Sequence, residues 1–342
     1  MYNRLMRKFF VVLVLFLGGA FVILSFGELE KIGETLKQGS LWFLLLAFLT
    51  EIAWFLIQGM TFQSIYRLLG LQEETRRLIL VATAVNFVNV VAPTAGVGGA
   101  ALFISDGRHR NQPPGKVTVA GILFLLSDYV AFLCVLALGL IVLVRRNNLT
   151  GGEITASLIM LAIAGVLGFL LYLGSRSAKK LGEALAWMAR AVNYLVRPFI
   201  HRDYLSQQRA HSFAEEIADG LSSLPDKPRS LLQPVLLALA NKAIMMTVLM
   251  FSFLSFEVPF SAGTIVGGFS IGYLFTIVSP TPSGIGVVEG VLALALKSLR
   301  VEWSQAVIIT LAYRAMTFWV PLGVGAMAFR SLRLDQAEEE FA

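Results

Sequence analysis

The sequence contains very few of the residues that build disulfides, metal sites and water-exposed surfaces. It has one cysteine, Cys134, and three histidines, all of which lie in polar segments. A disulfide framework within the chain is therefore excluded, and no Cys/His spacing typical of a metal site occurs. Charged residues make up 15% of the chain, whereas a soluble domain contains about 25%. We expect no enzyme, because a catalytic triad would need a histidine in the apolar core, and we expect no resident cofactor or metal.

Long apolar runs take the place of the missing polar residues. Hydrophobic residues make up 56% of the 342 residues, and the mean hydropathy is +0.73. A helix needs about 20 apolar residues to cross the hydrocarbon core of a bilayer. Six uninterrupted runs approach or exceed this length, at about residues 9–26, 41–60, 117–144, 154–174, 231–256 and 303–330. We predict an all-α integral membrane bundle that forms a single transmembrane domain over residues 1–342, with the first run retained as a span.

Two further apolar segments, about 78–105 and 262–299, are interrupted in the middle. The interruptions are Pro93-Thr94-Ala95-Gly96-Val97-Gly98-Gly99 and Pro280-Thr281-Pro282-Ser283-Gly284-Ile285-Gly286. Proline removes a backbone donor and glycine weakens a helix, so each segment is expected to form two helical pieces joined by a turn. If each pair returns to the side it came from, most Lys and Arg residues fall on the N-terminal side. This asymmetry predicts a multi-pass protein of the inner or plasma membrane with both termini in the cytoplasm.

The order of the segments suggests an internal repeat of opposite orientation. Each unit, 9–144 and 154–330, has three spans plus one broken helical hairpin, which gives about eight hydrophobic segments in all. The sequence Val91-Ala92-Pro93-Thr94 resembles Val278-Ser279-Pro280-Thr281, and each is followed by a Gly-x-Gly pair. Inverted repeats with discontinuous helices are typical of transporters. The alternative is that Pro-Gly turns simply end two unrelated hairpins.

A polar stretch at 175–230 interrupts the second unit. Leu181, Leu185, Met188, Val192 and Leu195 have helical spacing, which predicts an amphipathic cytoplasmic helix. One interpretation is a helix lying on an anionic leaflet, with Trp187 and Tyr194 at the interface. The other is a cytosolic helix pair packed on the bundle.

Ionisable groups inside the predicted spans are the first candidates for function, because each costs about 2.5–3.5 kcal/mol to insert. They are Glu51, Asp128, Lys242, Glu289 and Arg314. Either they contact a ligand, or they pair with one another as structural ion pairs. Arg314 is a candidate for phosphate binding because its guanidinium stays charged and planar.

The helix after the second break is expected to present free amides to an anion near Gly284. Thr281 and Ser283 can cap this helix or contact a ligand. The candidate substrate-binding set therefore includes both breaks, through Pro280, Thr281, Ser283, Gly284 and Gly286 in the second and Pro93, Thr94, Gly96 and Gly98 in the first.

The stretch Ser279–Gly290, together with Tyr313-Arg314 and Trp319-Val320-Pro321-Leu322-Gly323, resembles the signatures of a flippase-like family. That family is named after the transmembrane region of lysylphosphatidylglycerol synthases, and the likeness extends over about 9–330. The resemblance implies movement of a lipid with an anionic or aminoacylated head group, and it points to Pro280, Gly284, Gly286, Glu289 and Arg314. In the first half Ala101 and Leu102 stand where the second half has Glu289, so the two breaks are not equivalent. With its end at Ala342 the sequence has no aminoacyl-transferase domain, and we expect that it does not charge the lipid itself.

These observations predict a lipid flippase, with membrane lipids as partners and no nucleic acid. The alternatives are a solute or ion transporter with a closed aqueous cavity, or a non-transporting accessory protein of envelope-lipid synthesis. Small residues such as Gly263 and Gly267 allow close helix packing, so a homo-oligomer is one option.

Overall fold

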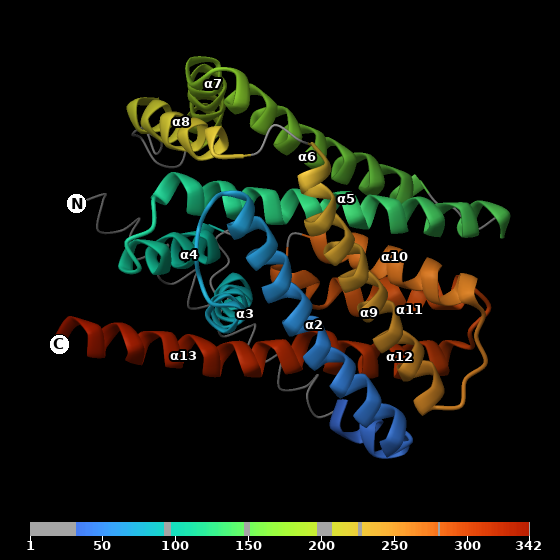
Figure 1. Cartoon of the computed structure of the whole chain (residues 1–342). Coiled ribbons are helices and arrows are strands. Elements are labelled where there is room, and N and C mark those ends of the chain that lie inside the picture. The colour runs from blue at the N-terminus through green and yellow to red at the C-terminus, as the bar shows by residue number, and fades with distance from the viewer. Residues whose placement is uncertain are drawn as a thin grey trace, which may run out of the picture.

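Residues 32–91, 97–146, 151–196, 207–224, 228–279 and 281–341 are described by a computed structural model of the chain. Within these ranges every regular element is a helix and no β-strand occurs (Figure 1). The predicted all-α class is thereby confirmed for the described part of the chain. The predicted span 9–26 and four residues of the breaks, Pro93, Thr94, Gly96 and Pro280, lie outside the described residues.

Five described helical stretches are long and apolar enough to cross a membrane. They are α2 (Leu41–Leu68), α5 (Pro114–Arg145), α6 (Gly151–Arg176), α9 (Leu232–Ser255), and a C-terminal stretch made of α12 (Trp303–Arg314) and α13 (Val320–Phe341). Each corresponds to one of the predicted spans. The chain is a multi-pass membrane protein.

The observed helices differ from the predicted runs in three places. Helix α2 continues beyond the predicted end near residue 60 as far as Leu68, because Phe62, Ile65 and Tyr66 form a buried stripe that a hydropathy average does not detect. Residues 32–38, which lie between the predicted runs 9–26 and 41–60, are helical as well. The last span contains a π-helical turn at Ala315–Trp319. Pro321 follows this turn and has no N–H to continue the α-helical bonds, which explains the change in winding.

The two interrupted segments each form a pair of helices. The first pair is α3 (Thr75–Val91) and α4 (Val97–His109), and the second is α10 (Ala262–Val278) and α11 (Val287–Ser298). Arg77, at the start of α3, forms an ion pair of 2.6 Å with Asp106 near the end of α4. The outer ends of the first pair therefore lie together. In the second pair, Gly268 of α10 lies against Leu296 near the end of α11, so these two helices also run back along each other.

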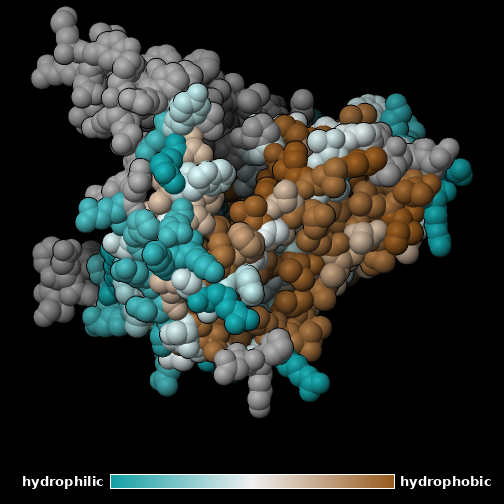
Figure 2. All heavy atoms as spheres, turned by 90° about the horizontal axis from the view of Figure 1, so that it is seen from above, coloured by the Kyte–Doolittle hydropathy of each residue, from teal (hydrophilic) through white to brown (hydrophobic). Residues whose placement is uncertain are grey.

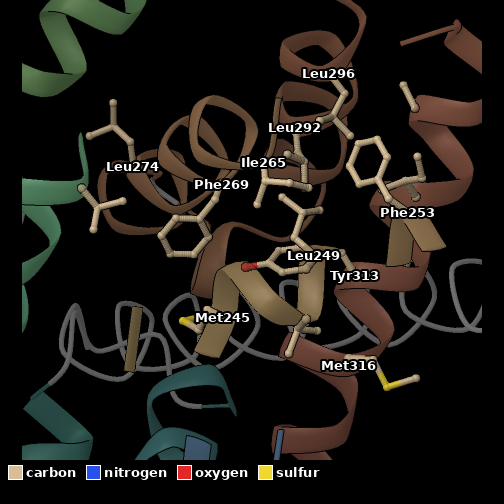
Figure 3. Close-up of a cluster of buried hydrophobic side chains, with 14 of the residues drawn as sticks. Met245, Leu249, Phe253, Ile265, Phe269, Leu274, Leu292, Leu296, Tyr313 and Met316 are labelled. Carbon is tan, nitrogen blue, oxygen red and sulfur yellow. The ribbon is translucent and has the colours of Figure 1, made fainter. Parts of the chain in front are cut away.

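Two buried clusters hold the bundle together. The larger one joins α9, α10, α11 and α12 through large side chains that interlock (Figure 3). Its labelled members are Met245, Leu249, Phe253, Ile265, Phe269, Leu274, Leu292, Leu296, Tyr313 and Met316. The second cluster joins α2, α3, α4, α5 and α13 with the polar insertion at 175–230. Helices α2 and α9 pack along each other between the two clusters.

The outer surface has the distribution expected of a membrane protein. Figure 2 shows hydrophobic side chains covering one broad region and hydrophilic side chains gathered mainly at one end. Large apolar side chains such as Leu49 on α2 and Phe169 on α6 are 50% and 58% exposed. Such exposure is costly in water but not in a bilayer, because lipid tails are as apolar as leucine.

The polar insertion at 175–230 forms a helix pair, α7 (Ala178–Val196) and α8 (Gln207–Ser222). Leu181 of α7 and Ile217 of α8 are buried in the second cluster, and α8 packs on the first turns of α5. The interpretation as a helix pair packed on the bundle is the one that the structure supports. Trp187 and Tyr194 point away from the pair and are 64% and 78% exposed.

The glycines that suggested contacts between copies of the chain are used within it. Gly263 and Gly267 of α10 lie against Val142 of α5, and Gly267 also meets Leu299. These two glycines therefore allow close helix packing inside the bundle.

Helices α5 and α8 approach so closely at Gly115 that no side chain fits there. A Cβ atom at this position would meet the carbonyl oxygen of Glu216. We expect Gly115→Ala to destabilise the fold by about 1–3 kcal/mol, because the backbone of α8 has to move. The measurement is thermal unfolding in detergent micelles, combined with limited proteolysis of the α7–α8 pair.

The matched control is Gly121→Ala on the same helix, where a Cβ would meet nothing within 4 Å. This change should be neutral or slightly stabilising, because alanine favours a helix over glycine. Equal unfolding temperatures for the two variants would contradict the assigned contact.

Candidate functional site

The first buried polar centre brings together Lys242 of α9, Asp128 of α5 and Tyr273 of α10. The Lys242 Nζ donates to Asp128 Oδ1 at 2.6 Å and to the Tyr273 hydroxyl at 2.5 Å. The Tyr273 hydroxyl in turn donates to Asp128 Oδ2 at 3.0 Å. Lys242 is fully buried, and its Nζ also lies 3.9 Å from the centroid of the Tyr273 ring. The positive charge of Lys242 is thus compensated by the Asp128 carboxylate and by the hydroxyl and ring of Tyr273. A buried cation requires such partners.

The second centre lies at the second break. Arg314 Nε donates to Glu289 Oε1 at 2.5 Å, and Arg314 Nη2 donates to the Ser283 carbonyl oxygen at 3.3 Å. The guanidinium lies 4.5 Å from the centroid of the Phe318 ring, in the π-helical turn. Arg314 is 3% exposed. It therefore holds the start of α11 and the turn before it against the last span.

The backbone of this turn follows from its sequence. Ser283, Gly284 and Gly286 have φ angles of 49°, 73° and 77°. Glycine adopts this left-handed region without strain. A side chain at position 284 would also collide with Val288. The two glycines allow the chain to reverse between α10 and α11 within eight residues, 279–286.

The predicted capping of α11 was wrong. The N-cap is Gly286, and no side chain caps the helix. The Thr281 hydroxyl pairs with the Ser279 hydroxyl at 2.8 Å instead, and the Thr281 N–H donates to the Ser279 hydroxyl. Ser283 takes part through its carbonyl oxygen, as an acceptor for Arg314. At the first break the cap comes from a residue that the sequence did not suggest: Asn89 Oδ1 accepts from the Gly99 N–H at 3.1 Å, one residue after Gly98.

A cavity of about 220 Å³ opens inside the bundle beside the first centre. Its polar lining comes from the spans α2, α5 and α9 and from the shorter helices α3 and α10, and its apolar lining includes Phe124, Leu125 and Met245. The Asn86 amide donates to Gln58 Oε1 at 3.1 Å across this lining. The polar residues that line the cavity are Trp54, Gln58, Thr61, Asn86, Asp128, Tyr129, Asn241 and Tyr273.

One apolar residue of the cavity lining is also partly exposed. Leu125 on α5 lines the cavity and is 44% exposed.

The five ionisable residues of the predicted site consequently separate into two ion pairs and one remaining carboxyl group. Asp128 and Lys242 form one centre, Glu289 and Arg314 the other, and Glu51 belongs to neither. Pairing, which was one of the two alternatives for these groups, thus holds for four of them. Glu289 forms an ion pair with Arg314 and so helps to fix the position of its guanidinium.

Sequence reasoning missed the uncharged part of the site. Tyr273, Gln58, Asn86 and Asn241 lie in apolar helices and carry no charge. The sequence signal for them is an amide or phenol side chain inside an apolar helix. This signal is weak, because polar side chains can also form hydrogen bonds to the backbone of their own helix. Among the described residues, no three His, Cys, Asp or Glu side chains are grouped as a metal site.

Comparison with known proteins gives one family. A family model described as "Lysylphosphatidylglycerol synthase TM region" matches residues 9–325. No curated protein matches the chain.

The first centre generates a stability prediction. Asp128→Asn removes the negative partner of a fully buried lysine, and breaking such a pair costs about 3–5 kcal/mol. The double variant Asp128→Leu with Lys242→Met removes both charges and should recover most of this loss. Denaturant unfolding in mixed micelles measures both variants against the unmodified protein. If the double variant were as unstable as Asp128→Asn, the pair would not be the source of the loss.

Proposed function

The chain belongs to the family of the lysylphosphatidylglycerol synthase TM region, and on this premise we propose that it moves an anionic or aminoacylated phospholipid between the leaflets of the cell membrane. The observation that carries the proposal is the polar cavity beside Lys242 and Asp128, whose lining includes the partly exposed Leu125 of α5. A head group can enter such a cavity while the acyl chains stay in the bilayer.

The chemistry of the lining suits a head group that has both charges. The Asp128 carboxylate lines the cavity and attracts an amine, whereas the buried Lys242 ammonium next to it attracts a phosphate. Amides from Gln58, Asn86 and Asn241 supply uncharged donors and acceptors around them. The substrate would displace part of the Lys242–Asp128 contact with its own charges, so that neither ion is left unpaired at any step.

The packing supports a transporter made of two inverted units. The last span of each proposed unit packs, through a glycine, on the first arm of the broken pair in the other unit. Gly139 of α5 meets Ser270 of α10, and Gly325 of α13 meets Thr83 and Phe87 of α3. Such a reciprocal arrangement is typical of repeats related by a two-fold axis. Rocking of one unit against the other would then expose the cavity to one leaflet after the other, and both termini would face the cytoplasm.

The second centre has a mechanical role in this proposal. Arg314 holds the turn before α11 through Glu289 and Ser283, so that the broken helix moves with the last span. A phosphate could reach the guanidinium only by replacing one of these contacts.

Two alternatives predict different results. A solute transporter needs a cavity closed to lipid, which the exposure of Leu125 argues against. An accessory protein without transport needs no cavity at all. No covalent step is required, so we propose no enzymatic activity.

The test is lipid translocation in proteoliposomes, followed by dithionite bleaching of tail-labelled phosphatidylglycerol and of its lysyl ester. We expect Gln58→Leu to slow translocation about tenfold or more, because a hydrogen bond to a charged group is worth about 1.5–3 kcal/mol. Leucine has nearly the same size as glutamine, so the lining loses its polarity while its volume is kept.

The matched control is Thr50→Val on the same helix, whose hydroxyl bonds to its own helix at Leu46 and does not line the cavity. It should move lipid at the rate of the unmodified protein. A Gln58→Leu protein that folds and moves both lipids at full rate would rule out the cavity as the head-group path. An unmodified protein that binds these lipids but moves neither would favour the accessory role.

A further inference from the structure

Glu51 is a buried carboxyl of a described span that belongs to neither of the two centres. It lies in the middle of α2 and is 1% exposed. Its Oε2 atom is buried and has no hydrogen-bond partner in the described part of the chain. Two further polar atoms share this condition, Trp54 Nε1 one turn further along α2 and Thr310 Oγ1 on α12.

Within the described residues, no unpaired cation is available to Glu51 from the helices packed against α2. Lys242 on α9 is bound to Asp128 on α5, and Arg314 on α12 is bound to Glu289. Helix α3 has its charged residues, Arg76 and Arg77, in its first turn. The titratable group within electrostatic range of Glu51 is Tyr313 on α12, which carries no positive charge.

An ionised carboxylate in this position would be buried without a counter-charge. Such a group costs many kcal/mol in a medium of low dielectric constant and takes up a proton instead. In the conformation described here, Glu51 is therefore a neutral carboxylic acid.

The position of Glu51 connects this proton to the moving parts. Helix α2 belongs to the first proposed unit. It packs against α3 and α5 of the same unit, and also against α9 and the π-helical turn of the second. Trp54, one turn away from Glu51, lines the cavity. A rocking movement between the units changes the surroundings of Glu51 and can admit water to it from the cavity.

We propose that Glu51 is the proton-binding site that couples lipid movement to the transmembrane proton gradient. The carboxylate takes one proton from water on one side and becomes a carboxylic acid, and after the rearrangement it releases the same proton to water on the other side. The step needs no redox partner. The proposal rests on the proposed function, and it names the proton gradient as the energy source for lipid movement.

The experiment compares proteoliposomes at equal pH with proteoliposomes under a gradient of about one pH unit. Exchange of tail-labelled phosphatidylglycerol at equal pH depends on the transport function alone. With coupling of one proton per lipid, a one-unit gradient should enrich the labelled lipid up to about tenfold in one leaflet. We expect Glu51→Gln to abolish this enrichment, because glutamine mimics the protonated acid permanently.

The matched control is Glu153→Gln on α6, a second buried carboxyl of a span, which has an interaction partner. It should keep the enrichment, and Glu51→Asp should keep it with a shifted pH dependence. Enrichment by Glu51→Gln equal to that of the unmodified protein would overturn the coupling while leaving transport intact.

Two further readouts keep the proposal separate from the transport function. Infrared difference spectra of the membrane-embedded protein should show the carbonyl stretch of a protonated carboxyl that Glu51→Gln lacks. The absence of this band would overturn the proposal even in a protein that moves no lipid. Failure of Glu51→Gln to fold would also contradict it, because a site for a neutral acid accepts the neutral amide of the same shape.

Discussion

The pairing of charges in a medium without water is the constraint on which the rest of the structure depends. Apolar helices in a bilayer gain little from burying more apolar surface, because the lipid is equally apolar. Their mutual positions must then come from close packing and from polar contacts. Asp128 comes from the first half of the chain, and Lys242 and Tyr273 come from the second. This one cluster fixes α5, α9 and α10 relative to one another, and the cavity lies beside it because the three polar side chains keep the helices from closing completely.

The broken helices follow from the same constraint. A chain reversal inside an apolar bundle exposes backbone groups that water cannot satisfy. At the first break Asn89 satisfies an N–H of α4, and at the second break Arg314 satisfies the carbonyl of Ser283. Asn89 belongs to α3, the first arm of its own broken pair, whereas Arg314 belongs to the last span. The first break is therefore held within its own helix pair, and the second is held against a neighbouring span.

Much of the fold was predictable from the sequence, but the contacts of the site were not. Span positions and the break at Ser283–Gly286 follow from hydropathy and from glycine and proline, which act locally. The end of α2 was missed because Phe62, Ile65 and Tyr66 are buried by tertiary contacts on one face only. Which carboxylate meets which cation depends on helix rotation, and the sequence does not encode this in any local pattern. The sequence did not even indicate that Tyr273 and Asn86 belong to the site, because uncharged polar residues are common in membrane-spanning helices.

The pairing of four charges also determines what the bundle can do in an electric field. Each of the pairs Lys242–Asp128 and Arg314–Glu289 is neutral as a unit. Movement of either pair relative to the membrane transfers no net charge, and a protonated Glu51 is neutral too. An ionised Glu51 would add one charge, whose full passage across the membrane is worth about 2.3 kcal/mol per 100 mV. In the proposed cycle the proton on Glu51 therefore decides both whether the interior is stable and whether its rearrangement responds to the membrane potential. With the proton gradient as the proposed energy source, this cycle requires no nucleotide.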